Sequence, residues 1–390
     1  MFAKCLRCVW CGHNHLLSIF YQCERCKGTL EIEYDYRSVF QQATFREMFN
    51  RPRKGIWKYR ELLPVASDAH VVTLGEGETP LIRAKRLEGF FQHERLYIKN
   101  ETVNPTLSFK DRPLSVALTV AQQFQVPGVV TASTGNTGVA AAAYAAKAGI
   151  PCKVFVPHGT PFEKRAIIEM YGATLVEVAG TFSDAYQEAE RETKVNGWFN
   201  LTSTFLNPYA IEGDKTLAYE VYFQLGFIPD WFIIPIGAGP LLVACYKGFK
   251  ELKMSGEISK LPRMVGVQAE NCAPIVRAFE EKDEEVKPWG KPETIASGIA
   301  DPLTTYPQDG TRTLRTIRES GGCAVGVSDE SIKRYRKLLA ETEGIFAESA
   351  AVTSIAVVEK LKPTGWIKPE ETVVCVVTGH GLKDLNLNFS

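Results

Sequence analysis

The alternation of short apolar segments with helical segments constrains the fold of this chain more than any other feature of its sequence. From about residue 96 onward, apolar stretches of strand length predict strands at residues 128–133, 152–156, 174–178, 231–236, 264–268 and 372–377. Helical patterns between them predict helices at residues 139–148, 164–171 and 242–250. This order predicts an α/β protein with largely parallel, open twisted sheets. Ligands of such sheets bind at the carboxyl ends of strands, so the informative turns are residues 133–138, 237–240 and 378–381.

Length and composition exclude several classes of protein. A chain of 390 residues predicts two large lobes and a smaller module, and 45% hydrophobic with 23% charged residues is typical of a globular protein. The formal net charge is zero, whereas a nucleic-acid-binding protein normally carries a basic excess. The apolar runs are shorter than the roughly 20 residues of a membrane-spanning helix. The N-terminus lacks the apolar core of a secretory signal, so we expect a cytoplasmic protein without membrane or nucleic-acid partners.

The first 36 residues form a separate module by their cysteine content. Cys8 and Cys11 form one Cys-x-x-Cys pair, and Cys23 and Cys26 form a second. Two such pairs supply four thiolates for a tetrahedral structural zinc site with no open position for catalysis. Cys5 with Cys8 is an alternative pair, and a ribbon held together by packing alone is the other alternative. His13 and His15 are expected on the surface, since four thiolates suffice.

Lys110 is the candidate nucleophile, within the segment Asn104-Pro-Thr-Leu-Ser-Phe-Lys-Asp-Arg112. A lysine becomes a nucleophile or forms a Schiff base when burial or a neighbouring cation lowers its pKa. An ordinary surface lysine is the alternative interpretation.

The turn at residues 133–138 is a candidate anion site. It contains Ser133, Thr134, Gly135, Asn136 and Thr137 between an expected strand and an expected helix. Backbone N–H groups at a helix N-terminus can hold a carboxylate. The alternative is a helix cap whose small residues allow close packing.

Two further turns have the composition of ligand sites. The first consists of Gly237, Ala238, Gly239 and Pro240, in which glycine lets backbone amides approach a phosphate and proline can begin a helix. It lacks the Gly-Lys-Ser/Thr ending of a nucleotide-binding loop, which favours a small phosphate on a cofactor. In the second turn, Thr378 ends a strand and is followed by Gly-His-Gly.

Taken in order, these motifs resemble the threonine synthase branch of the fold-type-II pyridoxal-phosphate enzymes. Further matching stretches are Gly75-Glu-Gly-Glu-Thr-Pro80, Asn207-Pro-Tyr-Ala-Ile-Glu-Gly213, Gly266-Val-Gln-Ala-Glu270 and Gly344-Ile-Phe-Ala-Glu348. The similarity runs along nearly the whole chain.

The resemblance implies a role for each motif. Lys110 would carry pyridoxal 5′-phosphate through a Schiff base, and Asn136 would contact the ring hydroxyl. The loop from Gly237 to Pro240 would hold the phosphate, and Thr378 would hydrogen-bond the pyridine nitrogen. The turn that begins at Ser133 would bind the carboxylate of an amino acid substrate. A homodimer is also implied, with a large lobe at about 37–115 and 205–390 and a small lobe at about 116–204.

Several positions depart from the family pattern. Ala210 stands where the family commonly has an arginine for the substrate phosphate, and Leu107 and Pro113 replace glycines. The stretch Ser297-Gly-Ile-Ala-Asp-Pro302 replaces an expected Ile-Gly-Asn-Pro-like segment. Features that hold the cofactor are kept and those for a substrate phosphate are altered, so another cation would be needed. Lys215, Arg112 and Arg312 are candidates.

The resemblance therefore implies, as the best single guess, an enzyme that forms threonine from O-phosphohomoserine. The alternative is a β-eliminating or β-replacing enzyme acting on serine-, threonine- or cysteine-like substrates, for which Ala210 is no handicap. A non-catalytic regulatory protein and a nucleic-acid-binding ribbon are hypotheses of other classes. An intact Lys110 disfavours the first, and the neutral net charge disfavours the second.

Overall fold

The computed structural model describes residues 1–52, 55–133, 135–158, 160, 162–180 and 182–384. The chain divides into two compact units, each with its own hydrophobic core. Unit 1 comprises Met1–Glu78, Asn104–Thr106 and Lys110–Thr216. Unit 2 comprises Thr79–Val103, Leu107–Phe109 and the chain from Leu217 onward. The expected lobe boundaries therefore remain a prediction, while the N-terminal module is part of unit 1.

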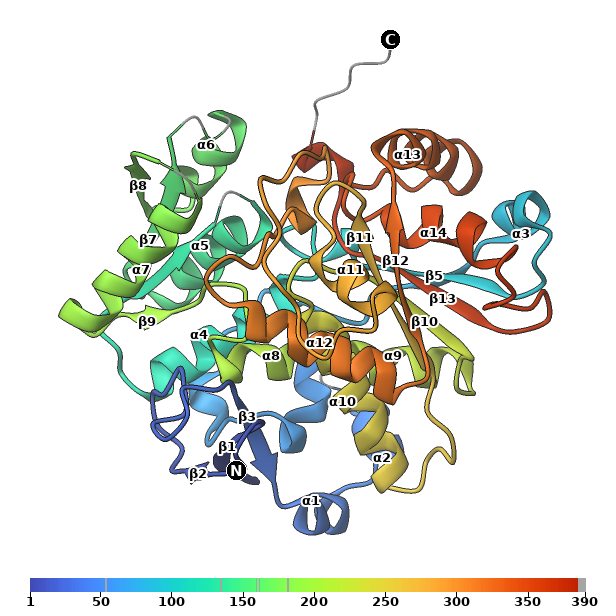
Figure 1. Ribbon diagram of the computed structural model, residues 1–390. Coiled ribbons are helices and arrows are strands. Elements are labelled where there is room, and N and C mark those ends of the chain that lie inside the picture. Colours follow the sequence, from blue (N-terminus) through green and yellow to red (C-terminus); the bar gives the residue numbers. More distant parts are fainter. Residues whose placement is uncertain (53–54, 134, 159, 161, 181, 385–390) are drawn as a thin grey trace. The chain divides into compact units, whose positions relative to one another are not determined.

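Unit 1 contains two sheets. A three-stranded antiparallel sheet has the order β2-β1-β3, and a four-stranded parallel sheet has the order β8-β7-β6-β9 (Figure 1). Its strands are β1 (Ala3–Cys8), β2 (Asn14–His15), β3 (Leu30–Tyr34), β6 (Val129–Ala132), β7 (Cys152–Pro157), β8 (Thr174–Val178) and β9 (Phe199–Asn200). Its α-helices are α1 (Tyr36–Gln42), α2 (Phe45–Phe49), α4 (Asp111–Gln123), α5 (Asn136–Ala148), α6 (Phe162–Met170), α7 (Phe182–Asn196) and α8 (Pro208–Asp214). Short 3-10 helices are η1 (Gly55–Leu62) and η2 (Asp68–His70).

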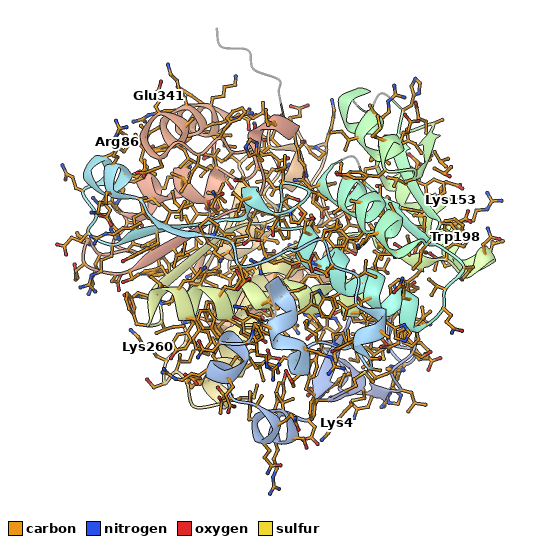
Figure 2. All side chains as sticks on the ribbon, turned by 180° about the vertical axis from the view of Figure 1, so that it is seen from behind. Lys4, Arg86, Lys153, Trp198, Lys260 and Glu341 are labelled. Carbon is orange, nitrogen blue, oxygen red and sulfur yellow. The ribbon has the colours of Figure 1, made fainter. Side chains whose placement is uncertain are left out.

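Helices cover both faces of the parallel sheet of unit 1. Helix α7 packs on one face, and α5 packs on the other between α4 and α6 (Figure 1). Helix α5 approaches the sheet closely because alanines fill its buried face and because Gly138 has no side chain. A Cβ added at Gly138 would lie only 3.2 Å from Val154. The helix ends at Gly149, whose φ of +67° is the left-handed conformation that favours glycine. Near the start of β7, the Lys153 ammonium lies 4.5 Å from the ring centroid of Trp198 (Figure 2).

Unit 2 is built on a six-stranded sheet with the order β12-β11-β10-β13-β5-β4, in which only β4 is antiparallel to its neighbour. The strands are β4 (Leu81–Arg83), β5 (Leu96–Asn100), β10 (Trp231–Pro235), β11 (Arg263–Ala269), β12 (Cys323–Val327) and β13 (Val373–Val377). The α-helices are α3 (Lys85–Phe91), α9 (Thr216–Leu225), α10 (Pro240–Met254), α11 (Pro274–Glu280), α12 (Pro307–Glu319), α13 (Asp329–Glu343) and α14 (Thr353–Leu361). The 3-10 helices are η3 (Glu101–Val103), η4 (Ser297–Ile299) and η5 (Gly381–Lys383).

The central strands of unit 2 are apolar throughout because both faces of the sheet are covered. Every residue of β10 and β13 is buried, as is typical of parallel strands between helices. Helices α3, α13 and α14 lie on one face, and α10 and α12 lie on the other (Figure 1). Arg86 of α3 donates to the carbonyl of Glu341 in α13 over 2.9 Å, which joins the outer helices (Figure 2).

The strands and helices expected from the sequence are confirmed, with ends shifted by a few residues. Expected strand 174–178 is β8, and expected helix 242–250 is the longer α10, which begins at Pro240. Within the described part of the chain, no helix combines the length and the apolar character that crossing a bilayer requires.

Candidate functional site

Lys110 lies immediately before α4 in unit 1 and is half-buried. Its Nζ donates a hydrogen bond to the hydroxyl of Ser203. Burial lowers the pKa of Lys110 to about 8, although the nearby Asp214 carboxylate acts in the opposite direction. An amine with this pKa is partly neutral near neutral pH and can act as a nucleophile, so the surface-lysine alternative is not supported.

The residues after Lys110 fix the first turn of α4. Asp111 is buried and accepts hydrogen bonds from the backbone and hydroxyl of Thr106 at 2.9–3.2 Å. Arg112 is fully buried and donates to the Thr216 hydroxyl over 3.0 Å. These contacts hold the helix start and therefore the backbone from which Lys110 projects.

The turn after β6 is organised by Ser133. Its hydroxyl accepts the N–H groups of Gly135 at 3.2 Å and Gly138 at 3.0 Å, so it caps the start of α5. Asn136 is the first residue of α5, and Thr137 is buried in its first turn. These hydrogen bonds agree with the capping interpretation, and they already use the N–H groups of Gly135 and Gly138. Anion binding at this helix N-terminus stays a prediction. Thr134 lies outside the described residues.

In unit 2, the loop Gly237–Pro240 joins β10 to α10. Gly239 has a φ of +95°, and a Cβ there would lie 2.4 Å from the Thr313 side chain, so only glycine fits. The carbonyl of Ala238 accepts from the Thr313 hydroxyl at 2.6 Å. The loop is therefore held through the carbonyl of Ala238. Pro240 takes the first position of helix α10, where no backbone donor is needed.

Asp301 faces this loop, which the sequence analysis did not foresee. Its carboxylate accepts the N–H of Ala238, the N–H of Leu303 at 3.1 Å and the hydroxyl of Tyr306 at 3.1 Å. Burial raises the pKa of Asp301. A carboxylate thus occupies one backbone donor of the loop that the family resemblance assigns to a phosphate.

Thr378 follows β13, the strand next to β10, and is buried. Its carbonyl accepts the N–H of Phe109 at 3.0 Å, so the residue covalently preceding Lys110 is tied to it. Leu107 lies two residues before Phe109 in the segment that pairs with Thr378. It has a φ of +62°, a conformation that costs a non-glycine residue about 1 kcal/mol. This is one of the positions at which the family has glycine.

Ser108 offers a buried hydroxyl that a small polar ligand could pair with. It is fully buried, and its hydroxyl has no hydrogen-bond partner among the residues that the structure describes. A buried hydroxyl without a partner costs about 1–3 kcal/mol, which a bound ligand would recover. This hydroxyl, the glycine loop and the low pKa of Lys110 each suit one part of a small phosphorylated aldehyde cofactor.

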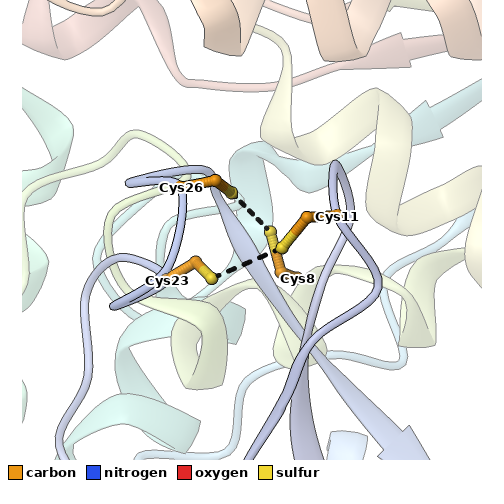
Figure 3. Close-up of side chains that lie close together, drawn as sticks. All are labelled: Cys8, Cys11, Cys23 and Cys26. Atoms are coloured by element: carbon orange, nitrogen blue, oxygen red, sulfur yellow. Dashed lines mark hydrogen bonds between the residues drawn. The ribbon is translucent and has the colours of Figure 1, made fainter.

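The four cysteines expected to bind metal come together. The sulfur atoms of Cys8, Cys11, Cys23 and Cys26 all lie within 4.8 Å of one another (Figure 3). Tetrahedral thiolate ligands at the usual zinc distance are about 3.8 Å apart, so the cluster has the right size. Cys5 lies on β1 outside the cluster, which excludes the alternative pair.

The expectation that His15 lies on the surface is wrong. His15 is 6% exposed, and its Nε2 lies 3.4 Å from the Cys23 sulfur, so it is a partner of a candidate ligand. Its place at the end of β2, which pairs with β1, brings it inward. His13 is exposed, as expected.

Two of the three candidate cations for a substrate phosphate are enclosed by the protein. Lys215 is fully buried, 2.6 Å from Glu212 and 4.2 Å from the ring centroid of Tyr34. Arg112 is also fully buried. Neither presents its charge to a ligand, whereas Arg312, on α12 beside Thr313, remains a candidate.

Sequence reasoning missed Ser203, Asp214 and Asp301. No local pattern marks Ser203 or Asp214, because only the folded chain brings them to Lys110. Asp301 could have been found, since it lies in the segment that departs from the family pattern.

Comparisons with known proteins agree with the resemblance. A family model described as "Pyridoxal-phosphate dependent enzyme" matches residues 72–379. Proteins named threonine synthase from Methanocaldococcus jannaschii and Methanosarcina acetivorans are 42% and 40% identical, each over 97% of this chain and 92% of its own length. Among solved structures, the processed form of threonine deaminase isoform 2 from Solanum lycopersicum matches with a TM-score of 0.68 and 21% identity, over 91% of each chain. The last match shows similarity of fold.

Proposed function

Because the chain belongs to the pyridoxal-phosphate dependent enzyme family, we propose that it is a threonine synthase that uses Lys110 to convert O-phosphohomoserine to threonine. The observation that carries this proposal is the similarity, over nearly the whole chain, to relatives named threonine synthase. The fold of the two units is that of the fold-type-II enzymes of this family.

Each group of the cofactor has a candidate partner in the chain. Lys110 would bind its aldehyde, and the loop of Gly237, Ala238, Gly239 and Pro240 would bind its phosphate. Asn136 would contact the ring hydroxyl, and Thr378 the ring nitrogen. When bound, the cofactor supplies an electron sink for charge that develops on the substrate.

Lys110 would also move the proton. Because burial lowers its pKa to about 8, its Nζ can take a proton from the substrate Cα at neutral pH and return it later. Ser203 holds this nitrogen in place. The turn of Ser133, Thr134, Gly135 and Thr137 would orient the substrate carboxylate.

The cysteine cluster would hold a structural zinc ion. Four sulfur ligands complete a tetrahedral shell, so the ion would stabilise the N-terminal module and take no part in chemistry. A cytoplasmic location and a homodimer remain expectations from the sequence and the resemblance.

A second candidate function is β-elimination or β-replacement on serine-, threonine- or cysteine-like substrates. The observation that favours it is Ala210, which lies in the first turn of α8 where an arginine for the leaving phosphate is expected. The burial of Lys215 and Arg112 favours it as well.

One assay separates the two functions. Cofactor-loaded protein is offered O-phosphohomoserine, and separately serine, threonine and cysteine, while phosphate, threonine and 2-oxo acids are measured. The proposal predicts stoichiometric phosphate and threonine from O-phosphohomoserine. Turnover of only the other substrates, with 2-oxo acid release, would replace it by the second function. Lys110→Ala is the control for both.

A further inference from the structure

The N-terminal ribbon, residues 1–36, is joined to the chain around Ser203 by partly buried hydrogen bonds within unit 1. The hydroxyl of Tyr21, between the two cysteine pairs, accepts the backbone N–H of Asn200 at 2.7 Å. In return, the hydroxyl of Tyr209 donates to the carbonyl of Ser18 at 2.8 Å. Burial raises the pKa of both tyrosines, so both hydroxyls keep their protons at physiological pH.

Asn200 connects this contact to the loop that carries Ser203. Its side-chain oxygen accepts the N–H of Thr202 at 2.9 Å, and its carbonyl accepts the side-chain amide of Asn207 at 2.8 Å. Asn207 in turn caps α8 by accepting the N–H groups of Tyr209 and Ala210. The position of Asn200 therefore fixes both ends of the loop at residues 200–207.

The same segment supplies both groups that act on Lys110. Ser203 lies in the loop and accepts the hydrogen bond from Nζ, and Asp214 is the last residue of α8. Helix α8 packs against β3 of the ribbon, and the Lys215 ammonium lies over the Tyr34 ring. The ribbon thus contacts residues 200–214, and these residues contact Lys110.

We propose that the ribbon, closed by a metal ion on its four cysteines, supports the reactive lysine, and that Tyr21 is the positioning residue through which it acts. The inference rests on Lys110 as the lysine that binds the cofactor, but not on the identity of the substrate. Loss of the Tyr21 hydroxyl leaves the buried Asn200 N–H without its acceptor, which favours a displaced, wetter loop. Water near Lys110 weakens the effect of burial and returns its amine toward the protonated form.

The test compares Tyr21→Phe with the matched control Tyr36→Phe. Tyr36 also lies next to Tyr34, with ring centroids 5.9 Å apart, but it belongs to α1. Each zinc-loaded protein is stripped of cofactor, and the rate of lysine linkage to added pyridoxal 5′-phosphate is followed by visible absorbance from pH 7 to 10. Bound zinc is measured in parallel. No substrate is present, so failure of this inference is distinguishable from failure of the proposed function.

We expect Tyr21→Phe to keep its zinc, to link the cofactor about tenfold more slowly at pH 7.5, and to recover near pH 10. Such a result corresponds to a rise of about one unit in the pKa of the amine. Tyr36→Phe should behave like the wild type. A wild-type rate and pH midpoint in Tyr21→Phe would overturn the inference.

A second variant covers the case in which Tyr21→Phe fails to fold. Tyr209→Phe removes the second hydroxyl of this contact, which belongs to helix α8. It changes no residue of the ribbon. It should shift the pH midpoint in the same direction. An unshifted midpoint in Tyr209→Phe would contradict a role for the ribbon in supporting Lys110.

Discussion

At the scale of single residues, the proposed chemistry depends on the protonation state of two groups, Lys110 and Asp301. Both are held in surroundings that disfavour charge, which lowers the pKa of the lysine and raises that of the carboxyl. In each case the pKa moves in the direction that favours the neutral form.

The first prediction concerns the pH dependence of Lys110. Its pKa is lowered to about 8, so the neutral amine predominates above that pH and the ammonium below it. We expect the rate of cofactor linkage to rise between pH 7 and 8 and to level off above about pH 8.5. Stopped-flow absorbance measures this rate. A rate that keeps rising to pH 10.5 would mean that Lys110 has the pKa of an exposed lysine.

The second prediction concerns Asp301. Its carboxylate accepts the Ala238 N–H of the loop that is proposed to bind the cofactor phosphate, so the two anions would compete for the donors of this loop. Asp301→Asn keeps the size and an acceptor oxygen but removes the charge. We expect the Kd of pyridoxal 5′-phosphate to fall about tenfold or more, with little change for pyridoxal, which has no phosphate. Calorimetric titration of both ligands tests this, and equal changes for the two would refute competition with the phosphate.

At the scale of elements, the site is built where α4 and α8 pack together. A Cβ on Gly213 of α8 would lie 2.2 Å from the Arg112 carbonyl of α4. The helices are therefore at the closest approach that glycine permits, and this approach brings Asp214 near Lys110. Helix α8 is in turn capped by Asn207 and begins with Pro208, both strong signals for a helix start.

The third prediction follows from this packing. Gly213→Ala should lower the free energy of unfolding by about 1–3 kcal/mol, because a backbone carbonyl cannot move out of the way easily. Gly89→Ala is the matched control, since Gly89 lies in α3 with nothing within 4 Å of its added Cβ. The control should be neutral or stabilising by up to about 1 kcal/mol. Denaturant unfolding of both variants measures the difference, and equal stabilities would show that α8 can shift.

The fourth prediction concerns the cysteine cluster. Cys23→Ser replaces one of the four candidate ligands, and Cys5→Ser changes a cysteine outside the cluster. We expect Cys23→Ser to bind less zinc and to unfold at a lower temperature, because metal binding contributes directly to folding. Cys5→Ser should keep one zinc per chain. Metal analysis and thermal unfolding provide the test, and full zinc binding in Cys23→Ser would exclude the proposed ligand set.

The elements with strong local signals were predictable from the sequence. Strand β8 and helix α5 were found because apolar runs, alanine content and glycine ends are local properties. The buried position of His15 was not, since it depends on the pairing of β2 with β1. Ser203 and Asp214 escaped prediction for the same reason: their role comes from the approach of α8 to α4, which no local pattern encodes. The site residues carried over from the family are proposals until they are tested.

At the scale of the whole molecule, the central claim is that Lys110 carries pyridoxal 5′-phosphate. The two units are separate folding cores, yet the segments 104–106, 107–109 and 110–216 alternate between them. Lys110 therefore follows directly on a segment of unit 2 in which Phe109 is tied to Thr378. Lys110 is thus one residue away from the backbone hydrogen bond between Phe109 and Thr378.

The most direct test is to reduce the cofactor-loaded protein with borohydride and to map the labelled peptide by mass spectrometry. The account predicts a single stable pyridoxyl adduct on Lys110, with no adduct elsewhere and none in Lys110→Ala. An adduct on another lysine, or none in protein that has bound the cofactor, would contradict the claim that Lys110 carries the chemistry.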